Sequence, residues 1–417
     1  YTTGNTLSLH DALPISLEIE DIRSFYQDRS RSDACLLDAE DEILTMNMVF
    51  RNADGSREGK AEGGEDIFID VANVADGSPF VQVNITAPAF EPLYPFITHN
   101  ESVDVSVEAA TANVTAINTL ELLVNGTAQA STTNDRLDAT LTLDSEGRYP
   151  IQAVAEVATD DGVRRDTAET VFIRRPVLET QPLPSGIQEG INYDDTGGVT
   201  LSLYAPNKEF VYVLGDFNDW AVDNSSIMTP TADGHWWITL PGSEIQDGTE
   251  YAFQYFVDGA LRMADPFSYK VLTPNDRFIS EAIYPNLKPY PDSLTENRVS
   301  VFETGQEAFD FSPFTPPPQE EMVVYELLLR DFVEESTYET LADTLDYLDR
   351  LGINAIELLP VSEFAGNNSW GYNPTFHFAL DKAYGPRESF KQFVEAAHSR
   401  GIAVILDVVY NHIDTQS

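Results

Sequence analysis

The sequence predicts a multidomain protein in which tandem all-β immunoglobulin-like sandwiches precede a unit of alternating strands and helices. Three observations lead to this fold class. The chain has 417 residues, more than one hydrophobic core supports. Up to about residue 288, short β-prone runs alternate with Asn, Asp, Gly and Pro turns, as the strands of a sandwich do. After residue 321, apolar residues recur at helical spacing between short apolar runs.

The amino-terminal part holds two segments that we separate from the rest. Residues 1–16 contain the run NTLSLHDALPIS, which resembles translated sequencing-adapter read-through, and we expect them to be a non-native leader. Residues 17–80 contain short β-prone runs between turn residues, so we expect the remnant of a β-sandwich module there. Cys35 is the only cysteine, which excludes a disulfide bond within the chain.

Residues 81–177 form the first complete predicted sandwich. Runs such as VDVSVEA, TLELLVNGTAQ and YPIQAVAEVATDDG alternate apolar and polar residues, as half-buried strands do. Asn125-Gly126 and Asp161-Gly162 are strong signals for tight hairpin turns. The segment is therefore predicted to be an immunoglobulin-like sandwich.

Residues 190–290 form a second all-β module after a linker rich in proline and glycine. Its strands are predicted at GVTLSLYAP, FVYVLGDF, HWWITLPG and EYAFQYFVDGALRMADP, and Asp258-Gly259 closes a hairpin. Trp220, Trp236 and Trp237 either form a glycan-binding platform or pack in the sandwich. Residues 236 and 237 point to opposite faces of a strand, so one of the two is expected in the core.

Residues 322–417 read as β-α-β-α-β. The runs MVVYELLLRDF, INAIELLP and IAVILDVVYNH are expected to be parallel strands, the first of them buried on both faces. Ser336 and Glu339 are placed as a capping box at the start of the first helix, and Gly352 and Gly401 as helix ends. The expected apolar faces of the two helices are Leu341, Leu345 and Leu348, and Phe390, Phe393, Val394 and Ala397.

Two architectures fit this repeat, a doubly wound sheet and a (β/α)8 barrel, and the pattern alone does not choose between them. The first strand is not followed by a glycine-rich phosphate loop, which removes the main support for nucleotide binding. In both architectures the loops after the strands build the site.

The charge balance restricts the class of ligand. The chain has 24 Lys and Arg against 69 Asp and Glu, a net charge of -45, and such a field repels nucleic acid and anionic membrane surfaces. The sequence contains no run of about 18 apolar residues, so membrane insertion is not expected. A neutral partner is expected, and the sequence leaves the oligomeric state unknown.

Five residues after the predicted strands are candidates for binding. Tyr372 and Trp370 offer flat apolar faces with polar edges, the kind of surface on which the C–H face of a sugar ring stacks. His412 and Asn411 offer hydrogen bonds to hydroxyl groups, and Asn411 is also a hard oxygen ligand for calcium. Asp407 ends the third strand, where a carboxylate alone more often caps local amides.

At these residues the sequence resembles a known family. VILDVVYNH, WGYNPTFHFALDKAYG and VVYELLLRDF, all within residues 322–417, resemble motifs of the α-amylase family of glycoside hydrolases. YAPNKEFVYVLGDFNDW and FQYFVDG, within residues 190–290, resemble the early-set sandwich that precedes the barrel in branching and debranching enzymes. The resemblance implies that residues 322–417 are the first three βα units of a (β/α)8 TIM barrel, truncated after its third strand.

The resemblance also implies roles for the candidate residues. Tyr372 is expected to stack on the glucose at the cleavage point and His412 to hydrogen-bond the same sugar, while Asp407 supports the site and Asn411 matches a calcium-binding position of many members. Trp370 joins these substrate-binding residues. The retaining mechanism needs two carboxylates about 5 Å apart. The resemblance places the nucleophile and the acid/base beyond residue 417, so no catalytic residue is assigned.

The expected function is that of a fragment of a glycoside hydrolase that cleaves α-1,4-glucosidic bonds of starch, glycogen or maltodextrin, with the fragment itself inactive. A branching or other transglycosylating enzyme of the same family is one alternative, and a non-catalytic glycan-binding protein is another. The expected partner is an α-glucan, calcium is the only cofactor expected, and the expected location is secreted, periplasmic or at the cell surface.

Overall fold

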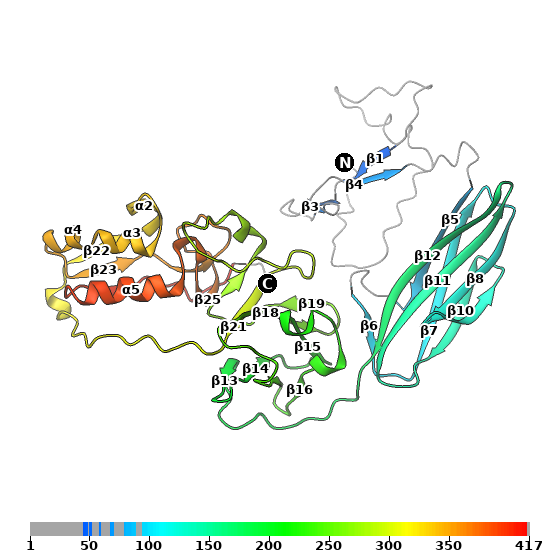
Figure 1. Ribbon diagram of the computed structural model, residues 1–417, viewed down its shortest axis with the longest axis horizontal. Coiled ribbons are helices and arrows are strands. Elements are labelled where there is room, and N and C mark those ends of the chain that lie inside the picture. Colours follow the sequence, from blue (N-terminus) through cyan, green and yellow to red (C-terminus); the bar gives the residue numbers. More distant parts are fainter. Residues whose placement is uncertain are drawn as a thin grey trace, which may run out of the picture. The chain divides into compact units, whose positions relative to one another are not determined.

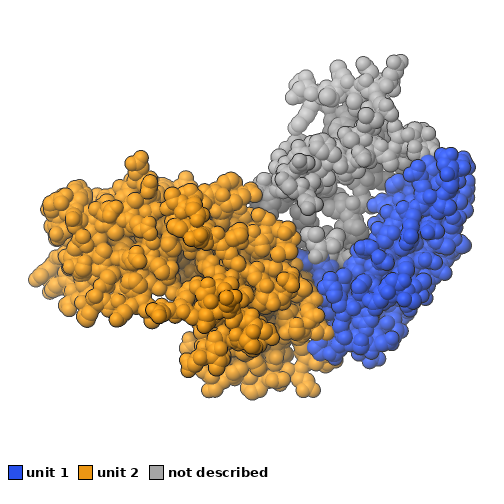
Figure 2. All heavy atoms as spheres, viewed as in Figure 1, with its two compact units in different colours: residues 1–176 blue, residues 177–417 orange. Residues whose placement is uncertain are grey.

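The computed structural model describes residues 79–88 and 94–414, together with the backbone of four short strands before them. The chain divides into two compact units, residues 1–176 and residues 177–417, which Figure 2 colours separately. The predicted leader and Cys35 lie outside the described residues. The four short strands form two antiparallel pairs, β1 with β4 and β2 with β3: β1 (Thr45–Met48), β2 (Phe50–Arg51), β3 (Glu58–Gly59) and β4 (Ile67–Asp70).

The first unit contains two sheets that share one core. A three-stranded antiparallel sheet has the order β10-β7-β5, and a five-stranded sheet has the order β6-β12-β11-β8-β9 (Figure 1). Alternate valines of β7 and leucines of β8 are buried in the same cluster, so the two sheets pack as a sandwich around one core. The strands are β5 (Phe80–Ala87), β6 (Phe96–Thr98), β7 (Ser102–Ala112), β8 (Ala116–Val124), β9 (Thr127–Thr132), β10 (Arg136–Thr142), β11 (Gly147–Thr159) and β12 (Gly162–Arg174).

The hairpin turns predicted from the sequence are confirmed. Asn125 and Gly126 join β8 to β9, both with positive φ, of 50° and 74°. Gly162 has a φ of 134° at the start of β12, which pairs with β11 along its whole length. Asn and Gly reach this region of φ at low cost, which explains their position at the turns.

The second unit begins with the predicted β module, again two sheets around one core. Their orders are β13-β14-β17-β16 and β15-β18-β21-β20, with β19 paired to β18. Asp258 and Gly259, with φ of 50° and 74°, form the predicted turn between β18 and β19. The elements are β13 (Gly190–Tyr193), β14 (Val199–Tyr204), β15 (Val211–Gly215), η3 (Asp216–Asn218), η4 (Asn224–Ser226), β16 (Thr229–Pro230), β17 (His235–Leu240), β18 (Glu250–Val257), β19 (Leu261–Met263), β20 (Val271–Leu272), η5 (Pro274–Phe278) and β21 (Val299–Glu303).

The tryptophans of this module do not form a shared platform. Trp220 and Trp236 are 6% and 4% exposed, and their indole nitrogens donate to Asp216 and to the carbonyl oxygen of Ala205. Trp237 is half-buried on the opposite face of β17, as the alternation of a strand requires. The glycan-binding platform of three tryptophans is therefore wrong, because two of the rings are part of the sandwich core.

The last part of the chain carries a parallel three-stranded sheet, β22-β23-β26, with its strands in chain order. This confirms the predicted β-α-β-α-β repeat. Among the described residues, none of the helices has the length and apolar character that a bilayer crossing requires. The elements are η6 (Gln319–Glu321), β22 (Val324–Leu327), α2 (Leu329–Phe332), α3 (Tyr338–Asp343), α4 (Leu345–Arg350), β23 (Ala355–Leu358), β24 (Ser362–Phe364), β25 (Pro374–Leu380), η7 (Lys382–Tyr384), α5 (Arg387–His398) and β26 (Ala403–Leu406).

The helices pack on this sheet through the predicted faces. Leu341, Leu345 and Leu348 are fully buried, and they share a cluster with Phe393 and Ala397 of α5 and with β23. Phe390 and Val394 pack against the same cluster. Gly352 and Gly401, with φ of 81° and 75°, follow α4 and α5 as expected of left-handed helix ends.

Two local predictions for this segment are wrong. The cap of α3 is Thr337, whose hydroxyl accepts from the amide of Thr340, because Glu339 instead accepts a hydrogen bond from Ser389 on α5 and Ser336 reaches the carbonyl of Arg330. The first strand is also shorter and more exposed than predicted. It covers only Val324–Leu327, and it has a neighbour on one side only in the described sheet.

Candidate functional site

Two loops meet after the parallel strands and carry most of the candidate residues. One is the turn between β24 and β25, which contains Trp370 and Tyr372. The other follows β26, where the amide of Asp407 donates to the carbonyl of Leu358 at 2.9 Å and so continues the parallel pairing. Because the carboxyl ends of parallel strands lie at the same edge of a sheet, loops distant in sequence reach one place.

Tyr372, Asp407 and His412 are in direct contact. The hydroxyl of Tyr372 donates to Oδ2 of Asp407 at 2.5 Å. Nε2 of His412 lies 3.0 Å from the carbonyl oxygen of Tyr372, and since a carbonyl only accepts, Nε2 is the donor. In a neutral imidazole, Nδ1 is then left as an acceptor. The structure therefore brings together three of the five residues that the sequence singled out.

The contact with Asp407 fixes the chemical form of Tyr372. Hydrogen bonding to Asp407, then burial and the charge of the same carboxylate, raise the pKa of Tyr372 to about 12. The charges of Glu326 and Glu357, on the neighbouring strands β22 and β23, act in the same direction. Tyr372 stays a neutral phenol at all ordinary pH values while 40% of the residue is exposed. It is an oriented aromatic ring rather than an acid or a nucleophile.

Gly371 allows the turn to present the two aromatic rings. Its φ is 88°, and a Cβ at this position would lie 2.2 Å from the carbonyl oxygen of Pro360. Its amide donates to the hydroxyl of Ser369 at 3.0 Å, and Ser369 is itself hydrogen-bonded to Asn373. Trp370, before the glycine, is 61% exposed. The turn thus holds one ring against Asp407 and leaves the other in solvent.

The calcium-binding role of Asn411 stays a prediction. Calcium takes six to eight oxygen ligands. Within residues 79–88 and 94–414, no three histidine, cysteine, aspartate or glutamate side chains converge as a metal site would require. Asn411 is exposed in the loop after β26. Amide and backbone carbonyl oxygens also bind calcium, so the absence of such an acidic cluster does not decide the role of Asn411.

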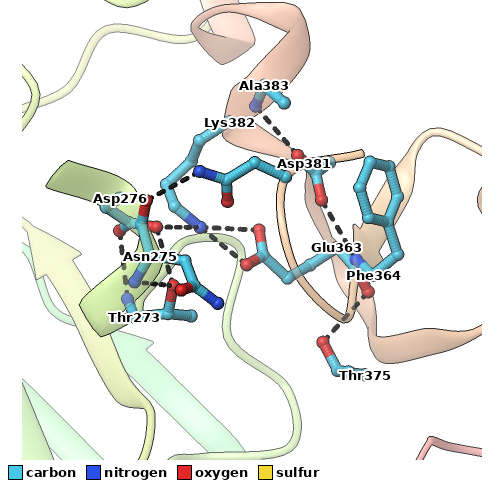
Figure 3. Close-up of polar contacts among 10 residues, drawn as sticks. Thr273, Asn275, Asp276, Glu363, Phe364, Thr375, Asp381, Lys382 and Ala383 are labelled. Carbon is cyan, nitrogen blue, oxygen red and sulfur yellow. Dashed lines mark hydrogen bonds and ion pairs between the residues drawn. The ribbon is translucent and has the colours of Figure 1, made fainter. Parts of the chain in front are cut away.

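A buried ionic cluster holds the base of the turn. Nζ of Lys382 donates to both carboxylate oxygens of Glu363 at 2.7 Å and lies 3.5 Å from Asp276 (Figure 3). Asp381 accepts from the amides of Phe364 and Ala383. The side chains of Lys382, Glu363 and Asp276 are each 3% exposed. One ammonium group therefore faces three carboxylates, one of which comes from η5 of the β module.

The excess of carboxylates changes the proton affinity of the cluster. Burial raises the pKa of Glu363 to about 8 against the opposing charge of Lys382, and burial raises the pKa of Asp381 to about 6. Burial by itself lowers the pKa of Lys382, but the charges of Glu363, Asp276 and Asp381 outweigh it, so this pKa is raised. Lys382 therefore stays charged, and the cluster retains a proton at a pH where exposed carboxyl groups have lost theirs.

This cluster predicts an unusual dependence of stability on pH. An acid with a higher pKa in the folded protein binds more protons when folded, so the free energy of unfolding of residues 177–417 is expected to fall as the pH rises from 4.5 to about 8. Urea unfolding across this range measures the slope. Glu363→Gln should flatten it. Asp331→Asn should not, because Arg330 lowers the pKa of Asp331 and its titration lies below the window. Equal slopes for wild type and Glu363→Gln would contradict the assignment.

Sequence reasoning missed this cluster. Lys382 and Asp381 lie in the quoted run FALDKAYG, but nothing in the residue pattern separates Glu363 and Asp276 from the many solvated acids of the chain. The members of the cluster lie up to about a hundred residues apart in the sequence, from Asp276 in η5 to Lys382 in η7. Only the folded chain shows that they share one buried space.

Two segments of residues 177–417 match known protein families. Residues 330–417 match the family described as alpha amylase, catalytic domain. This segment of the chain contains the five candidate residues. Residues 189–268 match carbohydrate-binding module 48, the isoamylase N-terminal domain, in the β module. The resemblance found in the sequence is thereby confirmed for these two segments.

Individual relatives match about half of the chain. A malto-oligosyltrehalose trehalohydrolase of Saccharolobus solfataricus is 32% identical over 52% of this chain, and a 1,4-alpha-glucan branching enzyme of Rhodococcus jostii is 31% identical over 52%. The chain spans 34% and 28% of the lengths of these two proteins. Among solved structures, the catalytic module of the glycogen-degrading pneumococcal virulence factor SpuA is 26% identical, with a TM-score of 0.44 over 54% of this chain and 37% of that chain.

Proposed function

We propose, starting from the match of two segments to the α-amylase catalytic domain and to carbohydrate-binding module 48, that the second unit is the substrate-binding part of an α-amylase-type glycoside hydrolase. The proposed substrate is an α-1,4-linked glucan such as starch, glycogen or maltodextrin. The observation that carries the proposal is the contact of Tyr372 with both Asp407 and His412 at the end of the parallel strands.

This arrangement suits a neutral sugar. The half-exposed ring of Tyr372 offers a flat apolar face to the C–H groups of a glucose ring. Asp407 holds that ring through the phenol hydroxyl, which reduces the conformational freedom lost on binding. Nδ1 of His412 is oriented by the bond of Nε2 and can accept from a sugar hydroxyl. Tyr372 and His412 bind and orient the sugar, and neither forms a covalent bond with it.

The proposed reaction is retaining hydrolysis, which uses one carboxylate as nucleophile and a second as acid/base. The family resemblance assigns those two carboxylates to strands that follow residue 417. We therefore propose that residues 1–417 bind glucan without cleaving it. The chain order of β22, β23 and β26, with α3 and α5 in one apolar cluster, supports a (β/α)8 barrel as the parent fold.

Transfer to a sugar acceptor is the second candidate reaction. The relative from Rhodococcus jostii carries the name of a branching enzyme, and it is nearly as similar to this chain as the trehalohydrolase is. An assay of a longer protein that includes the catalytic carboxylates distinguishes the two reactions by their products. Hydrolysis releases reducing ends, whereas branching leaves their number constant and creates α-1,6 linkages.

Substitution of Tyr372 tests the proposed site. Isothermal titration with maltoheptaose is expected to show binding to residues 1–417 that Tyr372→Ala weakens at least about tenfold, or about 1.4 kcal/mol. Tyr372→Phe keeps the ring and loses one hydrogen bond, so its loss should be about 1 kcal/mol or less. Tyr347→Ala, on α4 and 49% exposed, is the control. Unchanged affinity in Tyr372→Ala, or release of reducing sugar by residues 1–417, would overturn the proposal.

A further inference from the structure

The tip of the turn between β24 and β25 contacts the β module. The tip is the segment 366–371, which carries Trp370. Nδ2 of Asn367 donates to the backbone carbonyl oxygen of Asn275 in η5 at 2.7 Å. A carbonyl only accepts, so the side-chain amide of Asn367 must present its nitrogen to η5. The contact joins two residues that are 92 positions apart in the sequence.

The acceptor in η5 is held in place by buried side chains. The amide of Asn275 donates to the hydroxyl of Thr273 at 3.2 Å, and the carboxylate of Asp276 accepts from the amide and the hydroxyl of Thr273 (Figure 3). Thr273 and Asp276 are 7% and 5% exposed. Asp276 also lies 3.5 Å from Lys382 in the buried ionic cluster. Because the backbone around the carbonyl of Asn275 is already fixed, the contact with the tip orders nothing further on the side of the β module.

Apolar packing holds β25 against the β module at the same place. The ring of Phe267, in the β module, stacks on the ring of Phe378, in β25, with centroids 5.6 Å apart and planes 22° from parallel. Two further residues of the β module are buried in one cluster with two residues of β25. These four are Ala264, Val271, Phe376 and Ala379. The β module therefore contacts the turn at its base, through packing and the ionic cluster, and again at its tip.

The tip has few other fixed points. Within the described part of the chain, one further hydrogen bond joins residues 366–371 to another element, from Nη1 of Arg330 on α2 to Oδ1 of Asn368 at 2.8 Å. Trp370 is 61% exposed, so packing does not fix its ring. The position of Trp370 relative to Tyr372 therefore depends on the two asparagine contacts that hold the tip.

We propose that Asn367 is a positioning residue for the ring of Trp370, and that it acts through the backbone carbonyl of Asn275. The β module then serves the site as a fixed support for the tip of the turn. The inference rests on the proposed function for the claim that Trp370 meets a glucan, and on the contact of Asn367 for the claim that the β module holds the tip. A ring that is held beside Tyr372 before binding loses less conformational freedom when a sugar chain lies across both rings.

Two neighbouring substitutions form a matched pair for the test. Asn367→Asp replaces a donor by a carboxylate that only accepts, so the contact with the carbonyl of Asn275 is lost. Asn368→Asp adds the same charge one residue later, but its contact is kept, because a carboxylate still accepts from Arg330. Asn367→Ala is the second variant, which removes the donor without adding charge, for use if thermal unfolding shows that Asn367→Asp is misfolded.

Hydrogen exchange measures the support of the tip without a ligand. The amides of Ala365 and Gly371 are hydrogen-bonded inside the turn, to Asn373 and Ser369. In peptides of residues 1–417 that cover 365–373, we expect these amides to exchange about threefold to tenfold faster in Asn367→Asp, the range that one lost hydrogen bond gives. Asn368→Asp should exchange like the wild type. Equal exchange in the wild type and Asn367→Asp would overturn the inference.

Isothermal titration with maltoheptaose measures the consequence for binding. Asn367→Asp should weaken binding by about threefold to tenfold, and Asn368→Asp should not. In a Trp370→Ala background, Asn367→Asp should cause no further loss, because the residue acts through that ring. Unchanged affinity in Asn367→Asp, or an equal further loss in the Trp370→Ala background, overturns the positioning role. If neither Tyr372→Ala nor Trp370→Ala changes binding, the proposed function fails, whereas faster exchange in Asn367→Asp still supports the β module as the support of the tip.

Discussion

Replacement of Lys382 by methionine is expected to lower the free energy of unfolding of residues 177–417 by about 3–5 kcal/mol. Lys382 is the only cation in contact with Glu363 and Asp276 among the described residues, and all three side chains are 3% exposed. Methionine fills a similar volume without charge, so the carboxyl groups would remain buried without an opposing charge. Each would then stay ionised or take up a proton, and both cost free energy in the folded state. Loss of one partner of a buried ion pair costs far more than loss of a surface pair.

Tryptophan fluorescence during urea unfolding measures this effect selectively. All four tryptophans lie in residues 177–417, so the signal reports the second unit alone. Lys208→Met is the matched control. Lys208 lies 3.5 Å from Asp258 with 40% of its side chain exposed, and its loss should cost less than about 1 kcal/mol. Equal losses in the two variants would show that the buried cluster contributes no more than a surface pair.

A double variant distinguishes lost attraction from lost packing. Lys382→Met combined with Glu363→Gln removes one ammonium group and the carboxylate that it contacts twice. If uncompensated charge causes the destabilisation, the double variant should be more stable than Lys382→Met alone. If it is as unstable or less stable, the methionine packs poorly and the electrostatic explanation is wrong.

Local sequence signals predicted the β parts of the fold well. The hairpin pairs at Asn125, Asp161 and Asp258 depend on backbone conformations that only a few residue types adopt cheaply, so the residue type itself is informative. Alternating burial along β7 and β8 follows from the same local rule. These features need no knowledge of distant residues, and the sequence therefore indicates them directly.

Signals that compete with tertiary contacts were less reliable. Ser336 and Glu339 have the spacing of a capping box, but Glu339 contacts Ser389, fifty residues away. The long apolar run that begins at Met322 gave only four residues of strand, after which the chain turns into α2. The sequence left both a ligand platform and core packing open for Trp220, and its burial decides for the core.

Parts of the site region could likewise be predicted from the sequence, and other parts could not. The order of parallel strands predicted that Tyr372, Asp407 and His412 would lie together, and their contacts agree with that expectation. The buried ionic cluster could not be predicted, because Asp276, Glu363 and Lys382 come from three elements with no shared motif. Such a cluster depends on how η5 packs against β24 and η7, which no local pattern encodes.

The conformation of Gly371 gives the prediction with the largest expected effect on binding. In Gly371→Ala the new methyl group would lie 2.2 Å from the carbonyl oxygen of Pro360, a backbone atom that cannot turn aside. The turn must therefore shift, and Tyr372 moves with it away from Asp407. We expect maltoheptaose binding at Tyr372 to become unmeasurable in isothermal titration.

Gly366→Ala in the same turn separates two causes of lost binding, the steric contact with Pro360 and the strain of a left-handed backbone. Gly366 also has a positive φ, of 76°, but a Cβ there would have no neighbour within 4 Å. Alanine at this position meets only the left-handed backbone penalty, about 1–2 kcal/mol, and leaves the position of Tyr372 unchanged. Binding should therefore survive in Gly366→Ala at temperatures well below unfolding. If both alanine variants abolish binding equally, the left-handed backbone conformation rather than the contact with Pro360 determines the position of Tyr372, and the steric explanation is wrong.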